Sequence, residues 1–331
     1  MSRLAWFAAA LLVALLIPLW LGGSEALLQI RGFPAPLLLA LFAMIILCWL
    51  LNAARLRLLL ADQACRLSRW RSVGVVVATE FAICATPGGT GGPLTLMALL
   101  GRSGVRPARS SAVFAADQLN DLVFFLCALV AIAIYAVFHQ LNHNLQSLLL
   151  FSAVLMGAAL VGCYALGRYH RRAIRLAGRL MQRCGIQPRT RLHWARKVLH
   201  FLHAFSQTFK LPRRTLAAVF ALTCLHWGLR YSVLYLALQG LGTQVQWAWS
   251  FLIQMLSLSA GQLSLMPGGA GAAELTSAAL LAPLVGKHTA AAAIVLWRAV
   301  TYYFYLVAGA PVFLALVGRP LLRRLLRLRQ A

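Results

Sequence analysis

The chain has 331 residues, of which 61% are hydrophobic and 11% are charged, and its mean hydropathy is +0.79. A water-soluble globular domain carries about 25% charged residues, so this composition excludes that class and indicates a polytopic membrane protein. The net charge of +25 at pH 7 raises the question of nucleic-acid binding. No nucleic-acid-binding motif accompanies the charge, and we expect no nucleic-acid partner.

Six hydrophobic segments are long enough to cross about 30 Å of hydrocarbon as helices. In chain order they are 4–22, 34–54, 108–138, 146–167, 215–240 and 289–318. Two more hydrophobic segments, 72–101 and 247–286, are interrupted by proline and glycine, and we expect each to return to the side from which it entered. The predicted fold class is all-α: a single integral membrane domain over 1–331, with about six full spans and two broken or re-entrant helical hairpins.

The basic residues set the predicted orientation. With the N-terminus in the cytoplasm, 27 of the 31 Lys and Arg residues fall on the cytoplasmic side, whereas Arg31 and Lys287 fall outside. This asymmetry predicts that both termini are cytoplasmic. The segment 168–214 holds the densest group of these charges, and we expect it to form interfacial helices on anionic lipid.

The two broken segments carry an internal repeat. Residues 85–100 read ATPGGTGGPLTLMALL and residues 264–281 read SLMPGGAGAAELTSAALL. Their prolines lie 180 positions apart and, with one spacer allowed, five of the eight residues after each break are identical. The residues of the two breaks are Pro87, Gly88, Gly89, Gly91, Pro267, Gly268, Gly269 and Gly271.

Proline and glycine end helices, so each segment is expected to form two half-helices. The first has half-helices 72–86 and 93–101 around a break at 87–92, and the second has 247–266 and 272–286 around a break at 267–271. Irregular backbone at membrane depth must be covered by protein or trapped water, so both breaks are expected to face an internal cavity. The segments enter from opposite sides, which predicts the inverted repeat of many secondary transporters, with cores at 72–138 and 247–318.

Six ionisable residues fall inside membrane segments, and each costs about 2.5–3.5 kcal/mol at a helix centre. They are Glu80, Asp117, Asp121, Arg230, Glu274 and Arg298. Asp117 follows Leu100 by seventeen residues and Arg298 follows Leu281 by seventeen, so the repeat makes Asp117 and Arg298 symmetry mates. Arg298 also precedes the polar aromatic residues Tyr302 and Tyr303.

Structural roles for these residues stay open beside functional ones. Glu274 sits in the first turn of a half-helix and could act only as its cap. The two aspartates could neutralise Arg298 or Arg230 and lock the bundle, and Glu80 could bond the backbone at the break. The glycine pairs could serve helix packing alone.

The functional interpretation joins these groups into one site. Two half-helix N-termini together with Arg298 and Arg230 favour a phosphate or phosphodiester, and the carboxylates suit a cationic headgroup or a coupling proton. A polar headgroup that crosses through such a site while its tails stay in lipid describes a lipid flippase.

The motifs PGGAGAAE, RAVTYYFYLVAG, PGGTGG, LLGRSGV and ADQLND resemble the flippase-like transmembrane domain of lysylphosphatidylglycerol synthases, as in the membrane half of multiple peptide resistance factors. Residues 267–274 match the family's P-G-G-x-G-x-x-E and residues 298–303 its R-x-x-T-Y-Y. Two positions depart from the family: Pro93 replaces a Glu of the first repeat, and Gln118 replaces the Arg of E-R-L-x-D at 117–121.

The resemblance implies a lipid flippase of the bacterial cytoplasmic membrane, whose partners are an anionic phospholipid or a lipid-linked substrate. We expect no aminoacyl-transferase domain, no enzymatic activity, no cofactor and no metal. Two alternatives stay open: a non-catalytic partner of a lipid-synthesis enzyme and, less favoured, a polyprenyl-pyrophosphate phosphatase. The phosphatase is less favoured because the breaks carry no Ser, Arg or His.

Overall fold

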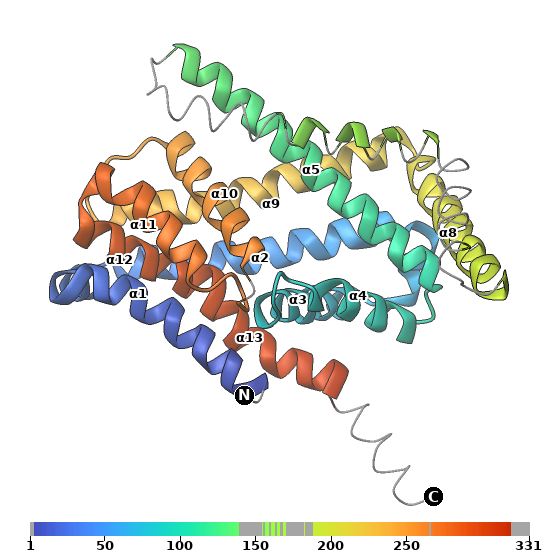
Figure 1. The fold of residues 1–331 in the computed structure, drawn as a ribbon, viewed down its shortest axis with the longest axis horizontal. Helices are drawn as coiled ribbons and strands as arrows, with labels where there is room; N and C mark the ends of the chain where they lie inside the picture. Colours follow the sequence, from blue (N-terminus) through green and yellow to red (C-terminus); the bar gives the residue numbers. More distant parts are fainter. Residues whose placement is uncertain are drawn as a thin grey trace, which may run out of the picture. The chain divides into compact units, whose positions relative to one another are not determined.

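The computed structural model describes residues 3–138, 188–264 and 266–318, together with isolated positions between 154 and 182. Throughout these ranges the chain forms helices joined by short connections and no β-strand (Figure 1), so the predicted all-α class is confirmed. The predicted span 146–167 lies mostly outside the described residues.

The first helices are α1 (Arg3–Arg31), α2 (Ala35–Leu60), the 3₁₀ turn η1 (Ala61–Arg66), α3 (Arg69–Ala85), α4 (Gly91–Arg102) and α5 (Pro107–Phe138). They are followed by α8 (Pro188–Phe209), α9 (Arg213–Gly240), α10 (Trp247–Leu263) and α11 (Ala272–Val285). The last helical run is α12 (Lys287–Arg298), η2 (Ala299–Tyr303), α13 (Phe304–Phe313) and η3 (Leu314–Gly318), in which η2 and η3 are π-helical.

Four helical runs of the described residues are long and apolar enough to cross a membrane: Ala35–Arg66, Pro107–Tyr135, Arg213–Gly240 and Lys287–Gly318. Helix α1 becomes a fifth if its segments Leu12–Pro18 and Trp20–Arg31, which make an angle of 83°, are counted as one span. The backbone of α1 leaves the helical conformation at Gly23, whose φ of 58° is readily adopted by glycine.

The described residues fall into two compact units. One is drawn from Met1–Ala54, Leu67–Ser103 and Leu225–Ala331, and the other from Arg55–Arg66 and Gly104–Cys224. The first unit contains both broken hairpins, α3 with α4 and α10 with α11.

Small residues bring the helices of the first unit together. Helix α1 runs beside α12 (Figure 1), and a Cβ on Gly22 would lie only 2.4 Å from the Cβ of Ala291. Helix α3 packs on α13, where a Cβ on Gly309 would lie 2.7 Å from the Cβ of Phe81. Close backbone approach through small residues is how helices pack in lipid, where no hydrophobic effect drives them together.

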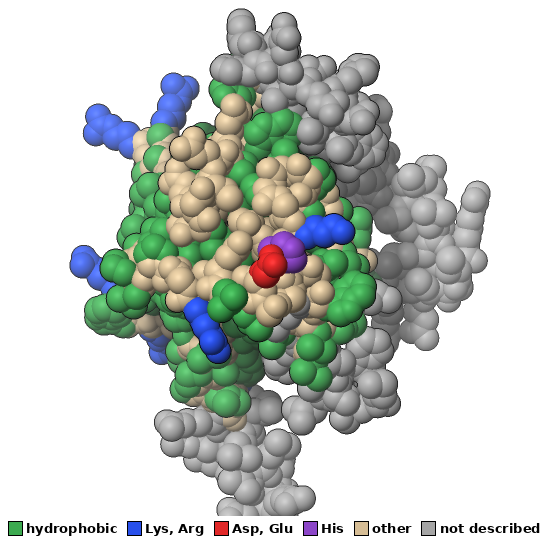
Figure 2. Space-filling model, turned by 90° about the vertical axis from the view of Figure 1, so that its left-hand side faces the viewer, with side chains coloured by type: hydrophobic (Ala, Val, Ile, Leu, Met, Phe, Trp, Pro, Cys, Tyr) green, Lys and Arg blue, Asp and Glu red, His purple; other side chains and the backbone are tan. Residues whose placement is uncertain are grey.

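The surface of the first unit has the character expected of helices in acyl chains. On the face drawn in Figure 2, charged side chains are few among the described residues, and hydrophobic side chains cover much of the surface. Trp20, Leu263 and Val307 are each more than 70% exposed. An exposed apolar surface of this kind is a liability in water and is stable against lipid tails.

In the second unit, α5 packs on α8. Arg109 near the start of α5 donates to the carbonyl of Leu59 at 2.9 Å and to the hydroxyl of Thr208 at 3.0 Å. Arg66 of η1 donates to the carbonyl of Gly104. These contacts fix one end of α5 to the end of α2 and to α8 within this unit.

Candidate functional site

The predicted breaks of both hydrophobic segments are confirmed. Helix α3 ends at Ala85 and α4 begins at Gly91, whereas α10 ends at Leu263 and α11 begins at Ala272. The interruption follows from the local sequence, because a proline and two glycines in succession disfavour the helical conformation.

The two breaks have the same backbone geometry. Gly88 and Gly89 have φ of 57° and 69°, and Gly268 and Gly269 have φ of 60° and 68°. In each break the N–H of the second glycine donates to the carbonyl three residues earlier, at 3.2 and 3.1 Å. Positive φ is readily adopted only by glycine, so the shared P-G-G motif encodes the shared turn.

The tips of the two hairpins meet inside the first unit. Pro87 and Pro267 pair as an isolated antiparallel β-bridge. Gly88 lies against the carbonyl of Gln262 at the end of α10, where an added Cβ would be 3.5 Å from that oxygen. Segments 180 residues apart in the chain thus place their non-helical backbone side by side.

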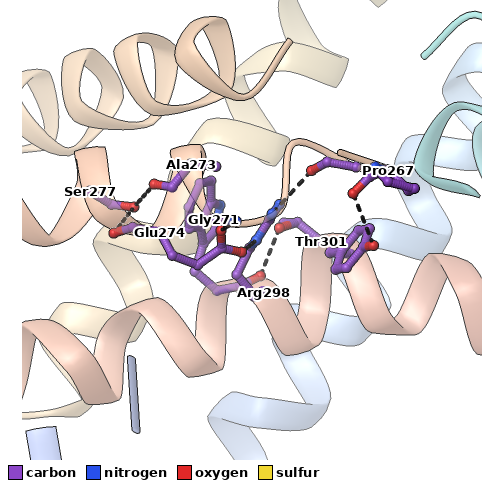
Figure 3. Close-up of polar contacts among 10 residues, drawn as sticks. Pro267, Gly271, Ala273, Glu274, Ser277, Arg298 and Thr301 are labelled. Atoms are coloured by element: carbon purple, nitrogen blue, oxygen red, sulfur yellow. Dashed lines mark hydrogen bonds and ion pairs between the residues drawn. The ribbon is translucent and has the colours of Figure 1, made fainter. Parts of the chain in front are cut away.

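A buried ion pair holds the second break. Arg298 donates from Nε to the carboxylate of Glu274 and, from Nη2, to the carbonyl of Gly268 at 3.0 Å. The other carboxylate oxygen of Glu274 accepts from the N–H of Gly271 at 2.7 Å (Figure 3). The Glu274 side chain is fully buried and that of Arg298 is 3% exposed. The predicted capping role of Glu274 is confirmed, and Arg298 adds an ion pair to it.

A π-helical turn places Arg298 and Tyr302 on the same break. Arg298 is the last residue of α12 and η2 follows directly. The hydroxyl of Tyr302 donates to the carbonyl of Pro267 at 3.3 Å, and its ring lies 4.6 Å from the guanidinium carbon of Arg298. The ring of Tyr303 lies 5.2 Å from that of Tyr302. Single π-turns inside α-helices are frequent at functional sites.

The first break is held by a neutral side chain. The hydroxyl of Thr86 accepts from the N–H of Gly91 at 2.8 Å and donates to the carbonyl of Ala82 at 2.7 Å. Gly91 corresponds to Gly271 in the repeat, so Thr86 satisfies the N–H that Glu274 satisfies in the second break. Pro93 aligns with Glu274, so the first break has no carboxylate at this position. Thr86 caps the break instead.

A second ion pair of the first unit joins α3 to α9. Nη1 of Arg230 lies 3.5 Å from a carboxylate oxygen of Glu80, and both side chains are largely buried. The prediction that Glu80 bonds the backbone at the break is wrong, because its carboxylate instead faces α9. Arg230 is thus ion-paired, but with Glu80 and not with the predicted aspartates. Its guanidinium carbon also lies 5.0 Å from the ring of Tyr305 and 5.4 Å from that of Trp227.

The aspartates of α5 have a partner that the sequence analysis missed. Arg55 contacts Asp117 at 2.6 Å and Asp121 at 2.7 Å, and donates to the hydroxyl of Thr223 at 3.1 Å. The expectation that these aspartates neutralise Arg298 or Arg230 is therefore wrong. Arg55 was counted as a cytoplasmic flanking charge, yet it is buried because α2 continues as a helix to Leu60. The residues LRLLL after Arg55 extend the hydrophobic segment, and they could have indicated that the helix continues past this arginine.

The predicted site residues thus form three groups. Glu274, Arg298 and Tyr302 clamp the second break, and Glu80 with Arg230 links α3 to α9, all in the first unit. Asp117 and Asp121 belong with Arg55 to the second unit. Among the described residues, no group of three or more His, Cys, Asp or Glu side chains has metal-binding geometry.

Comparison with known proteins agrees with the motifs at the breaks. The family model described as the lysylphosphatidylglycerol synthase TM region matches residues 7–309. A UPF0104 membrane protein from Archaeoglobus fulgidus is 23% identical over 282 residues, which cover 83% of this chain and 84% of that protein. The residues that the family model matches include both breaks and all three ion-paired groups.

Proposed function

Since the chain belongs to the lysylphosphatidylglycerol synthase transmembrane-region family, we propose that it is a flippase or transporter that moves a phospholipid or a lipid-linked polar headgroup across the bacterial cytoplasmic membrane. The observation that carries this proposal is the pairing of the two broken helices at Pro87 and Pro267 in a unit that also buries two acid–arginine pairs. The orientation with both termini in the cytoplasm is part of the proposal.

Broken helices supply what a headgroup path needs. Non-helical backbone offers N–H and C=O groups at membrane depth, where an intact helix offers none. In secondary transporters such breaks form the substrate site, and the two repeats move against each other around it. The matching turns at residues 88–89 and 268–269 give the two hairpins equivalent tips, which suits an alternation between one side and the other.

The charge pairs support a passage that opens and closes. Removing charges from water costs several kcal/mol each, and a well-packed apolar core of equal volume is often as stable as a buried ion pair. An apolar core could therefore stabilise the bundle without this desolvation cost, which favours a functional role for the ion pairs. Arg298 and Glu274 bond each other and the backbone of the second break. A passing headgroup would exchange with these bonds, its phosphate on Arg298 and its cationic or hydroxyl groups on Glu274.

Leaflet exchange in liposomes tests the proposal. The purified chain is reconstituted with lipids labelled on the headgroup, and exchange is measured by the fraction of label accessible to a membrane-impermeant quencher. We expect exchange above that of protein-free liposomes, and a loss of about tenfold or more for Glu274→Gln and Arg298→Gln. His288→Gln is the matched control, since His288 pairs with Glu25 through exposed side chains away from the breaks.

Two results would contradict it. Exchange no faster than in protein-free liposomes, for zwitterionic, anionic and lysyl-carrying headgroups alike, would remove the transport function. Exchange at the wild-type rate in both ion-pair variants would show that the pair only locks the bundle.

A second candidate, a non-catalytic partner of a lipid-synthesis enzyme, draws on α8. This helix exposes apolar Trp194 and Leu199 beside basic Arg196, a composition suited to an anionic lipid surface or an acidic partner. Of these two, we propose that α8 binds the anionic lipid surface. If the chain is a non-catalytic partner, charge reversal across 188–209 abolishes its function in cells, whereas Glu274→Gln and Arg298→Gln retain function. If the chain is a flippase, Glu274→Gln and Arg298→Gln lose function.

A further inference from the structure

The two buried arginines of the first unit differ in how completely they are hydrogen-bonded. Arg298 donates to Glu274 and to Gly268, and its carboxylate partner is itself capped by Gly271. Within the described part of the chain, Arg230 has one hydrogen-bonded partner, Glu80, at 3.5 Å, the outer limit for such a bond. A guanidinium carries several N–H donors in a rigid fork. The Arg230 side chain is only 15% exposed, so its remaining donors have little access to solvent.

Two more buried donors lie in the same cluster. The hydroxyl of Tyr305 and the indole N–H of Trp49 have no hydrogen-bond partner among the described residues. Tyr305 is 1% exposed and Trp49 is 7% exposed, and their rings meet edge to face at 5.3 Å. Tyr305 in turn faces Arg230, with its ring 5.0 Å from the guanidinium carbon. Buried polar groups are nearly always hydrogen-bonded in native proteins, so these two donors beside a weakly bonded cation point to a ligand-binding position.

The chemistry of the cluster selects an anion. Indole N–H and guanidinium groups can only donate, and the phenol hydroxyl donates when it meets a strong acceptor. Among the described residues, the acceptor hydrogen-bonded to Arg230 is the carboxylate of Glu80, and the other groups of the proposed site are donors. Phosphate has several acceptor oxygens, and two of them can accept parallel N–H bonds from the planar guanidinium of an arginine. We propose that Arg230, Tyr305 and Trp49 form a binding site for a phosphate group, and that Glu80 is the internal anion that holds Arg230 while the site is empty.

This inference rests on the proposed function and deepens it, because it adds Arg230 to Arg298 as a residue that binds the headgroup phosphate. Three helices converge on the group: Trp49 from α2, Arg230 from α9 and Tyr305 from α13, with Glu80 on α3. The long contact between Glu80 and Arg230 is weak enough for a phosphate to displace the carboxylate. Glu80 therefore competes with the ligand, and its effect on affinity is opposite to that of the three donors.

The opposite signs make the test specific. The purified full chain in nanodiscs of zwitterionic lipid is titrated with inorganic phosphate and with dihexanoyl phosphatidylglycerol, and binding is followed by tryptophan fluorescence and ³¹P line broadening. Dihexanoyl glycerol, which lacks the phosphate, is the control ligand.

We expect Arg230→Gln, Tyr305→Phe and Trp49→Phe each to weaken binding about tenfold or more, as for the loss of one hydrogen bond to a charged ligand. Glu80→Gln is expected to tighten binding about tenfold, because it removes the competing charge. Arg230→Lys retains the charge and loses the fork, so it falls between the wild type and Arg230→Gln. His288→Gln binds as the wild type does.

The two probes separate the sources of the phosphate. Arg230-dependent binding of the lipid alone assigns the site to a lipid phosphodiester, and binding of inorganic phosphate alone assigns it to a soluble anion. No saturable binding of either probe, or Glu80→Gln weakening the affinity as Arg230→Gln does, would overturn the site and leave a structural ion pair with ordered water. If Arg230→Gln fails to fold, the Tyr305→Phe and Trp49→Phe variants still decide, since each removes a donor that has no hydrogen-bond partner among the described residues.

The outcome is independent of the transport assay. Arg230-dependent binding without leaflet exchange would retain the anion site and remove the flippase. Leaflet exchange that depends on Arg298, together with binding indifferent to Arg230 and Glu80, would retain the flippase and remove this site.

Discussion

Gly268→Ala is the sharpest test of how the second break is built. Gly268 has a φ of 60°, which costs an L-amino acid about 1–2 kcal/mol. Its added Cβ would lie 2.0 Å from Cε2 of Tyr302, a fully buried ring whose hydroxyl donates to the carbonyl of Pro267. Overpacking of this kind costs about 1–3 kcal/mol more, so we expect a total loss of about 2–5 kcal/mol in the free energy of unfolding.

Gly88→Ala is the matched control at the equivalent position of the first break. Its φ is 57°, nearly that of Gly268, but the added Cβ would meet only the carbonyl of Gln262 at 3.5 Å, an ordinary contact. This variant is expected to lose about 1–2 kcal/mol, the backbone cost alone. The difference between the two alanines, about 1–3 kcal/mol, isolates the contact with Tyr302.

The assay is unfolding of the purified chain in mixed micelles titrated with SDS, followed by tryptophan fluorescence. Adding Tyr302→Ala to Gly268→Ala removes the clash, so the double variant should lose less than the sum of the single losses. Equal losses for the two glycine variants, within about 0.5 kcal/mol, would show that Tyr302 does not close on the second break.

Three further variants address the polar contacts by the same unfolding assay. Thr86→Val keeps the side-chain shape but leaves the N–H of Gly91 without its acceptor, and should lose about 1–3 kcal/mol; a loss below that range would mean that water caps the first break. Glu274→Ala strands the buried Arg298 and should lose about 3–5 kcal/mol, whereas an unchanged stability would refute the ion pair. Arg55→Met strands the two aspartates of α5 and should lose about 3 kcal/mol, more than the same change at the half-buried Arg57; equal effects would contradict the buried cluster.

Much of the candidate site could be predicted because its local cause lies in a few adjacent residues. Proline followed by two glycines ends a helix wherever it occurs, so the sequence located both breaks to within a few residues. Glu274 follows its break by a single turn, which makes its capping role a local property as well. The long apolar runs determined the helical class, because lipid leaves no other structure for them.

The partners of the charges were decided by the tertiary structure. Arg55 and Asp121 are 66 residues apart and Arg230 and Glu80 are 150 apart, and helix periodicity does not say which faces of two distant helices meet. Tertiary packing also decided three other features. Thr86 caps the first break in place of a carboxylate, and the π-turn carries Tyr302 to Pro267. The donors of Trp49 and Tyr305 find no partner among the described residues. Each depends on how helices rotate and approach one another, and that is set by packing summed over the whole unit.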